Sequence, residues 1–145
     1  MKIGVDSSVF VAGLHANHPF HGPAVNWLLH NIPLHELIAA HHTILETYAV
    51  LTRLPVSLRI TGSEAKQLLE TTVRPNVQIA AFSGASIWDC VDSLVEKAAA
   101  GGQSYDAFIA GILVSAGVEA IATFNIRHFS QFADDLVLID PLKPS

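Results

Sequence analysis

Lys2-Ile3-Gly4-Val5-Asp6 is a short apolar run that ends in an acid, and it predicts a buried strand. Ser7 and Ser8 follow at once and offer hydroxyl groups at which a helix can begin. A carboxylate directly after an apolar strand has no packing role, so Asp6 is a candidate functional residue. The alternative is structural, since an acid here can also cap the helix that follows.

The rest of the chain continues this alternation of strands and helices. Further strands are predicted at Glu36–Ala40, Val77–Ala80, Ala120–Thr123 and Leu136–Ile139. Helices are predicted at Ala24–Leu29, Thr43–Leu54, Glu64–Leu69, Ser83–Ala100 and Ser104–Ala116, with a short helical turn at Arg127–Phe132 and caps at Ser63 and Ser104. His15–Pro23 is expected to be a loop. The pattern indicates an α/β fold with a mostly parallel sheet of about five strands and helices on both faces.

Composition limits the class of protein. The chain has 145 residues, of which 50% are hydrophobic and 14% charged, and this suits a single domain over residues 1–145. The apolar stretches are interrupted well short of the roughly 20 residues that a membrane-spanning helix needs, and no secretory signal is visible. Cys90 is the only cysteine, which excludes a disulfide framework and favours a cytoplasmic location.

The charge balance is unusual for a protein that binds nucleic acid. The chain has 13 Asp and Glu against 8 Lys and Arg, so its net charge is −5. Nucleic-acid binders usually carry a basic footprint. Such a function would therefore depend on a few well-placed cations and on metal ions that offset the acids.

Four oxygen-bearing side chains are expected to meet at the carboxyl edge of the sheet, where parallel sheets bind their ligands. They are Asp6 and Asn125 after strands, Glu46 one turn into a helix, and Asp106 at a helix start. Neighbouring carboxylates suppress each other's ionisation unless a cation is present, and oxygen ligands suit Mg²⁺ or Mn²⁺. The set predicts metal-assisted phosphodiester hydrolysis, although each member alone has a structural explanation.

Four motifs occur in an order that resembles a known family. They are Val5-Asp6-Ser7-Ser8-Val9, Leu45-Glu46, Tyr105-Asp106-Ala107-Phe108-Ile109-Ala110 and Thr123-Phe124-Asn125-Ile126-Arg127-His128-Phe129. Together they look like the PIN-domain family, most closely its small VapC-like toxins, over about residues 2–140. The resemblance implies a three-layer α/β/α fold and a Mg²⁺- or Mn²⁺-dependent endoribonuclease that is the toxin of a type II toxin–antitoxin pair.

The resemblance also implies roles for individual residues. Asp6, Glu46 and Asp106 match the acidic metal ligands, and Asn125 matches a fourth catalytic position that is often Asp. Because Asn lacks the charge, a second metal ion should bind weakly. Thr123 matches a hydroxyl residue beside the site, and His128 replaces a further Asp. Family members typically form dimers and are held inactive by a cognate antitoxin, so RNA, a second copy and an antitoxin are the expected partners.

Contacts with the substrate are expected from residues next to these positions. Arg127 flanks Asn125, and we expect it to bind the substrate together with Ser7, Thr123 and His128. The other candidate cations are Arg53, Arg59 and Arg74. Arg53 lies seven residues after Glu46, so both face nearly the same side of one helix.

Other functions stay open at this stage. The main alternative is a PIN-like module that only binds RNA or a regulator, because Asn125 weakens the site. A DNA nuclease of the same superfamily is disfavoured by the small size of the chain. The chain lacks the key residues of phosphotransfer folds, and it contains no phosphate-binding glycine fingerprint. A zinc site at His15, His18 and His21 lacks a fourth ligand nearby, so a polar loop is favoured there.

Overall fold

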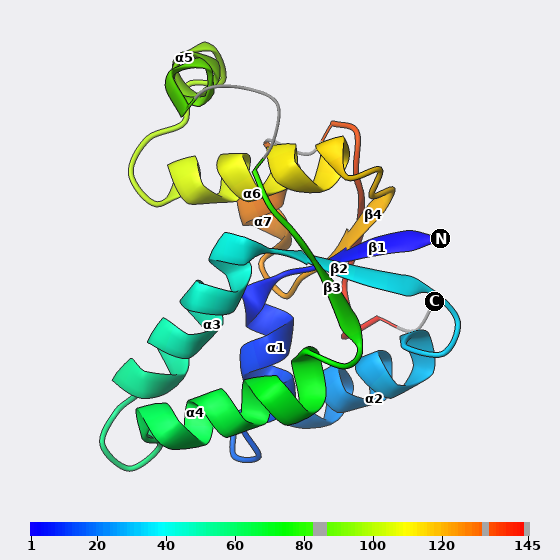
Figure 1. Cartoon of the computed structure of the whole chain (residues 1–145), viewed down its shortest axis with the longest axis vertical. Helices are drawn as coiled ribbons and strands as arrows, with labels where there is room; N and C mark the ends of the chain where they lie inside the picture. Colours follow the sequence, from blue (N-terminus) through cyan, green and yellow to red (C-terminus); the bar gives the residue numbers. More distant parts are fainter. Residues whose placement is uncertain (83–86, 132–133, 144–145) are drawn as a thin grey trace.

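One parallel sheet forms the centre of the protein in the computed structural model, which describes residues 1–82, 87–131 and 134–143. Its order is β3-β2-β1-β4-β5, and every neighbouring pair is parallel (Figure 1). The strands are β1 (Lys2–Val5), β2 (Glu36–Ala40), β3 (Val77–Ala80), β4 (Ala120–Ala122) and β5 (Val137–Ile139). This confirms the α/β fold predicted from the alternating pattern.

Helices cover both faces of the sheet, as the sequence predicted. The described helices are α1 (Ser7–Leu14), α2 (His21–Asn31), α3 (His41–Arg53), α4 (Gly62–Leu68), a π-helical turn η1 (Leu69–Val73), α5 (Ile87–Glu96), α6 (Gln103–Ser115) and α7 (Ile126–Ser130). In Figure 1, α1, α2 and α4 lie on one side of the sheet, and α6 and α7 lie on the other. None of the described helices is long and apolar enough to cross a membrane.

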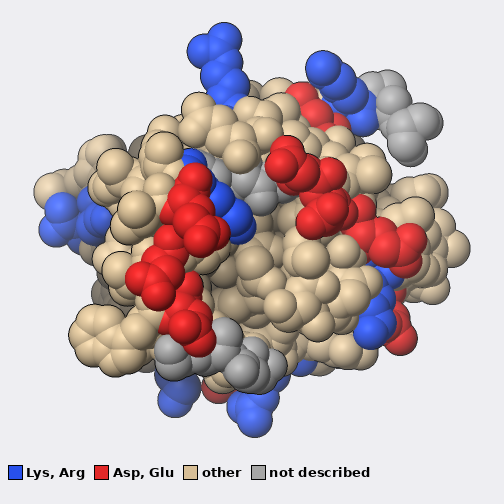
Figure 2. All heavy atoms as spheres, turned by 90° about the horizontal axis from the view of Figure 1, so that it is seen from above, with Lys and Arg blue, Asp and Glu red and all other residues tan. Residues whose placement is uncertain are grey.

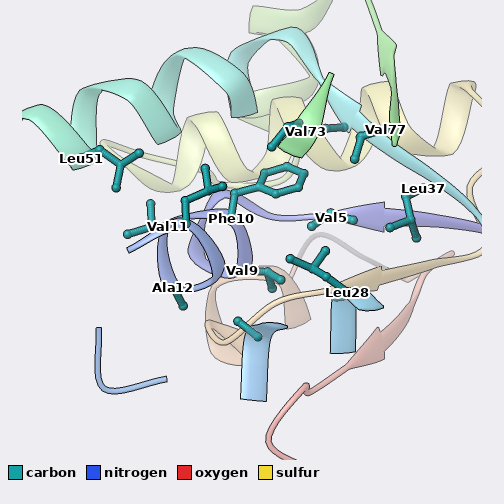
Figure 3. Packing of buried hydrophobic residues seen from close by; sticks show 14 of the residues in the cluster. Val5, Val9, Phe10, Val11, Ala12, Leu28, Leu37, Leu51, Val73 and Val77 are labelled. Atoms are coloured by element: carbon teal, nitrogen blue, oxygen red, sulfur yellow. The ribbon is translucent and has the colours of Figure 1, made fainter. Parts of the chain in front are cut away.

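Two hydrophobic clusters hold these layers together. On one face Val5 of β1 belongs to the same buried cluster as Phe10 of α1 and Leu51 of α3, and Figure 3 shows such side chains gathered around Phe10. On the other face Ile121 of β4 belongs to a cluster with Leu113 of α6. Complete burial of such side chains contributes about 1.5–3 kcal/mol each to folding. Because the central strands are covered on both faces, their sequences are almost continuously apolar.

Gly4 lets α6 approach the central strand closely. A Cβ atom at this position would lie 2.7 Å from Cδ1 of Leu113, which is too close for two carbon atoms. The helix that carries Asp106 is therefore packed directly against the strand that precedes Asp6.

Several predicted element ends differ from the structure. The loop expected at His15–Pro23 ends earlier, because α2 begins at His21 and accepts Pro23 in its first turn, where no backbone N–H is needed. Helix α4 is capped by Thr61, whose hydroxyl accepts from the Glu64 N–H at 3.1 Å, and not by Ser63. Ser104 lies inside α6 after the cap residue Gly102, and α5 ends at Glu96. The bounds of α2, α3, β4 and β5 differ from the predicted ones by one to three residues at one or both ends. Residues 83–86 and 132 are outside the described part of the chain.

Candidate active site

An open cleft of about 1120 Å³ lies at the carboxyl ends of β1, β2 and β4. The chain runs from β1 outward to β3 on one side and continues with β4 on the other, so this edge is the topological switch point at which open α/β sheets bind ligands. The residues that line the cleft include Asp6, Ser7, Ser8, His18, Phe20, His42, Glu46, Arg53, Tyr105, Asp106, Phe124, Asn125 and His128.

Asp6 is held at the base of the cleft by hydroxyl groups. Its Oδ2 accepts hydrogen bonds from Ser8 Oγ at 2.7 Å and from Thr123 Oγ1 at 2.8 Å, and Ser8 N lies 3.4 Å away. The residue therefore caps α1, as the structural explanation predicted, and it also lines the cleft. Its Oδ1 receives no hydrogen bond from the described residues. Burial raises the pKa of Asp6, while the bonds from Ser8 and Thr123 oppose this.

The same hydroxyl groups join two ends of the sheet. Ser8 Oγ accepts from the Phe124 N–H at 3.0 Å, and Thr123 Oγ1 accepts from the Asn125 N–H at 2.9 Å. Thr123 is fully buried. The network thus fixes the turn after β4, which carries Asn125, against the carboxylate that follows β1.

Glu46 enters the cleft from α3. Its Oε1 accepts a hydrogen bond from the Ser7 hydroxyl, and its Oε2 lies 3.6 Å from His42 Nε2 one turn earlier in the helix. These two contacts hold the carboxylate from both sides and direct it toward the residues that follow β1.

Asp106 enters from the first turn of α6. Burial raises the pKa of its carboxyl to about 6, and the negative charges of Asp6 and Glu46 act in the same direction. His128 opposes this rise, with Nδ1 at 4.0 Å from Asp106 Oδ2. The three carboxyl groups therefore lie within electrostatic reach of one another, as the sequence predicted.

The three carboxylates of the cleft are suitable ligand types for a hard divalent cation, but they do not form a complete coordination site. Among residues 1–82, 87–131 and 134–143, no three His, Cys, Asp or Glu side chains lie close enough to form a ready-made metal site. Mg²⁺, however, usually keeps several water ligands and binds through one or two carboxylates. The free Oδ1 of Asp6 and the carboxylate of Asp106, with its raised pKa, match that requirement.

The expected substrate contacts are distributed differently from the prediction. Ser7, Asn125 and His128 line the cleft. Thr123 does not line the cleft, because it is fully buried and its hydroxyl donates to Asp6. Its place in the structure is to hold Asp6 and not to contact a substrate directly. Arg127 is exposed on α7 but is not among the residues that line the cleft, whereas Arg53 is.

Several aromatic residues of the cleft were not predicted from the sequence. Phe20, Tyr105 and Phe124 line it, and none had been assigned a role. Two of them carried a signal, because Tyr105 precedes Asp106 and Phe124 precedes Asn125 in the chain. Phe20 had none, since its place depends on how the loop after α1 folds back.

The histidine run does not form a zinc site in the described structure. His15 uses both ring nitrogens: Nε2 donates to the Leu58 carbonyl at 2.6 Å, and Nδ1 accepts from the Asn17 N–H at 3.2 Å. His21 Nδ1 donates to the Ala12 carbonyl at 2.8 Å, and His18 Nδ1 accepts from the Phe20 N–H at 3.0 Å. These side chains stabilise the loop, in agreement with the favoured structural explanation.

Comparison with known proteins places the chain among ribonucleases. It is 34% identical to ribonuclease VapC40 of Mycobacterium tuberculosis over 119 residues, which are 82% of this chain and 84% of that protein. It is 39% identical to ribonuclease VapC27 of the same species over 67 residues, 46% of each chain. No protein-family model matches the sequence.

Solved structures share the fold at low sequence identity. The VapBC2 complex of Rickettsia felis, bound to a DNA fragment from its promoter, matches with a TM-score of 0.70 and 17% identity over 97% of this chain and 98% of that chain. VapC20 of Mycobacterium tuberculosis, a toxin that cleaves the sarcin–ricin loop, matches with a TM-score of 0.65 and 18% identity over 82% and 86%.

The three-layer fold, together with the 34% identity to a VapC ribonuclease over most of the chain, defines this protein as a PIN domain. The identity to VapC40 over most of both chains narrows this class further: the chain belongs to the VapC family of PIN-domain ribonucleases.

Proposed function

We propose that this protein is a Mg²⁺- or Mn²⁺-dependent endoribonuclease that acts in the cytoplasm, as a single PIN-like domain, as the toxin of a type II toxin–antitoxin pair. One observation carries the proposal. Asp6 after β1, Glu46 on α3 and Asp106 on α6 line one cleft; burial raises the pKa of Asp106, and the charges of Asp6 and Glu46 add to this rise. Acids brought together in this way are unfavourable unless a cation or a proton offsets them.

Asp6 and Asp106 are the residues that would hold the cation, with Glu46 and the side-chain oxygen of Asn125 as further ligands. A bound divalent ion supplies positive charge to the phosphodiester oxygens and makes water a better nucleophile. The protein's own contribution is orientation. Ser8 and Thr123 hold Oδ2 of Asp6 and leave Oδ1 for the cation, while Ser7 and His42 hold the two oxygens of Glu46.

His128 is a candidate for moving a proton during cleavage. Its side chain is 62% exposed and lies 4.0 Å from Asp106. A histidine side chain at the edge of the cleft is suited to give a proton to a departing oxygen.

A cognate antitoxin and a second copy of the chain are the proposed protein partners. The fold is shared with chains of the solved VapBC2 and FitAB structures, both bound to DNA fragments. This chain also has an apolar groove between α3, α4 and β3, where Leu45, Tyr48 and Ile79 are exposed. Exposed apolar patches of this kind are typical of protein interfaces.

A module that binds RNA or a regulator without cleaving it is the second candidate, favoured by the amide of Asn125 and by the lack of a ready-made three-ligand site in the described chain. The test is cleavage of a mixed RNA pool in Mg²⁺ or Mn²⁺ by the wild type and by Asp106→Asn. We expect cleavage by the wild type that is lost with chelator and in the variant. Cleavage that is indifferent to both, or RNA binding without cleavage, would contradict the proposal.

A further inference from the structure

Two pairs of aromatic rings lie in the cleft that holds the carboxylates. Phe20 packs on Phe124 with ring centroids 5.0 Å apart and planes at 33°, and Tyr105 stacks on His42 at 4.8 Å and 8°. All four residues line the cleft. The pairs come from different elements, since Phe20 and Phe124 lie in the turns before α2 and α7, and His42 and Tyr105 lie at the starts of α3 and α6.

In each pair one ring is exposed to solvent and packs against its partner ring. Tyr105 is 56% exposed and Phe20 is 38% exposed. Neither is needed to fill the hydrophobic core, because neither belongs to the two buried clusters. An open aromatic face beside a polar cleft is suited to a flat ligand, and its partner ring keeps it in place.

Both pairs are tied to the carboxylate groups. His42 lies 3.6 Å from Glu46, and Tyr105 immediately precedes Asp106. On the other side the backbone N–H of Phe124 donates to Ser8 Oγ, which in turn donates to Asp6. A strand whose phosphate lies at the carboxylates therefore has two aromatic faces available within the same cleft.

The charge of the cleft favours stacking over phosphate contacts as a source of affinity. Arg53 is the only Lys or Arg among its lining residues in the described chain, against three carboxylates. On the face seen in Figure 2, Asp and Glu form two groups and most of the visible Lys and Arg lie near the rim, in keeping with the net charge of −5 of the whole chain. Phosphate contacts, which normally dominate affinity for nucleic acid, are therefore scarce, whereas base stacking on an aromatic ring needs no cation.

We propose that Phe20 and Tyr105 are specificity-determining residues that each stack one unpaired base of the RNA strand in the cleft. This inference rests on the proposed ribonuclease function. Bases in an A-form duplex remain stacked within the helix and cannot reach an aromatic side chain, whereas bases in loops and ends can be turned outward.

The test is the binding of a short single-stranded RNA that contains 2-aminopurine, measured by fluorescence in Ca²⁺. Phe20→Leu and Tyr105→Leu keep an apolar side chain but remove the ring, and each should weaken binding about tenfold and reduce the quenching of 2-aminopurine. Phe20→Tyr and Tyr105→Phe keep the ring and should bind as the wild type does. A duplex of the same sequence should compete at least tenfold less well.

Leucine variants that bind and quench like the wild type, or a duplex that competes equally, would overturn the inference. Circular dichroism and thermal unfolding show whether each variant is folded. If Phe20→Leu is unfolded, Tyr105→Leu decides, because that side chain is mostly exposed. Failure of the proposed function is distinct, since the wild-type protein would then cleave no RNA with Mg²⁺ or Mn²⁺.

Discussion

The Thr123 hydroxyl donates a 2.8 Å hydrogen bond to Oδ2 of Asp6, and this bond connects two residues that are 117 positions apart in the chain. It joins the carboxyl ends of the neighbouring strands β4 and β1. The acid at the centre of the proposed metal site is thus oriented by a buried residue that does not itself reach the cleft.

Thr123→Val tests this relationship, because valine has nearly the same shape but no hydroxyl. The change leaves the Asn125 N–H without its acceptor and Asp6 without one donor. We expect the free energy of unfolding to fall by about 1–3 kcal/mol and cleavage to fall roughly ten- to a hundredfold through misplacement of the carboxylate. Urea unfolding and RNA cleavage measure the two effects. Thr123→Ser, the matched control, should keep most of both, and a valine variant equal to the wild type would remove Thr123 from the supporting network.

The raised pKa of Asp106 predicts how stability depends on pH without metal. The ordinary carboxyl value of 3.8 applies to the unfolded chain and about 6 to the folded protein. Between these pH values the folded state binds more protons than the unfolded chain does. The contribution of Asp106 to the free energy of unfolding is therefore fully present below about pH 4 and is lost as the pH rises to about 6. Because the side chain is partly exposed, we expect a loss of only about 1 kcal/mol, less than the full shift implies.

Asp106→Asn removes this titration, so in chelator the variant should be about 1 kcal/mol more stable than the wild type at pH 7 and have a flatter profile between pH 4 and 6. Part of the slope remains, because the pKa of Asp6 is also raised. Guanidinium unfolding across this range provides the measurement. A variant that is less stable than the wild type at pH 7 in chelator would mean that the carboxylates do not oppose one another.

Divalent cations should stabilise the folded wild type. At a concentration a hundredfold above Kd, binding adds about 2.7 kcal/mol, which corresponds to a rise in Tm of about 5–10 °C for a chain of this size. Differential scanning calorimetry with Mn²⁺ tests this. Asp6→Asn, which keeps the shape of the side chain, should lose the shift, and an unchanged shift in that variant would place the ion elsewhere.

Arg53 is expected to contact the RNA backbone more than Arg127 does. Arg53 lines the cleft, and Arg127 is exposed on α7 outside it. Arg53→Ala should weaken binding and reduce the slope of log affinity against log salt by about 0.7, the value for one phosphate contact to a single strand. Arg127→Ala is the matched control with the same loss of charge. An equal effect of both substitutions would favour a general charge effect.

Local pattern was sufficient to predict the sheet and most of the carboxylate site. The strands Glu36–Ala40 and Val77–Ala80 were predicted with their observed bounds, because buried parallel strands are short apolar runs between turns. The convergence of Asp6 and Asn125 follows from the common edge at which parallel strands end.

What could not be predicted depends on tertiary packing. Thr61 caps α4 instead of the neighbouring Ser63 because of the local backbone geometry at the helix start, and both residues are suitable caps by type. The place of Arg127 depends on how a five-residue helix is rotated. Phe20 reaches the cleft because its loop folds against the turn that carries Phe124, a contact between distant segments that no periodicity encodes.

The most direct measurement of the central claim is the anomalous X-ray signal of Mn²⁺ in crystals of the wild-type protein. We predict a peak in the cleft, about 2.0–2.5 Å from a carboxylate oxygen of both Asp6 and Asp106. A peak bound elsewhere, or full Mn²⁺ occupancy in the cleft of Asp6→Asn and Asp106→Asn crystals, would contradict the account.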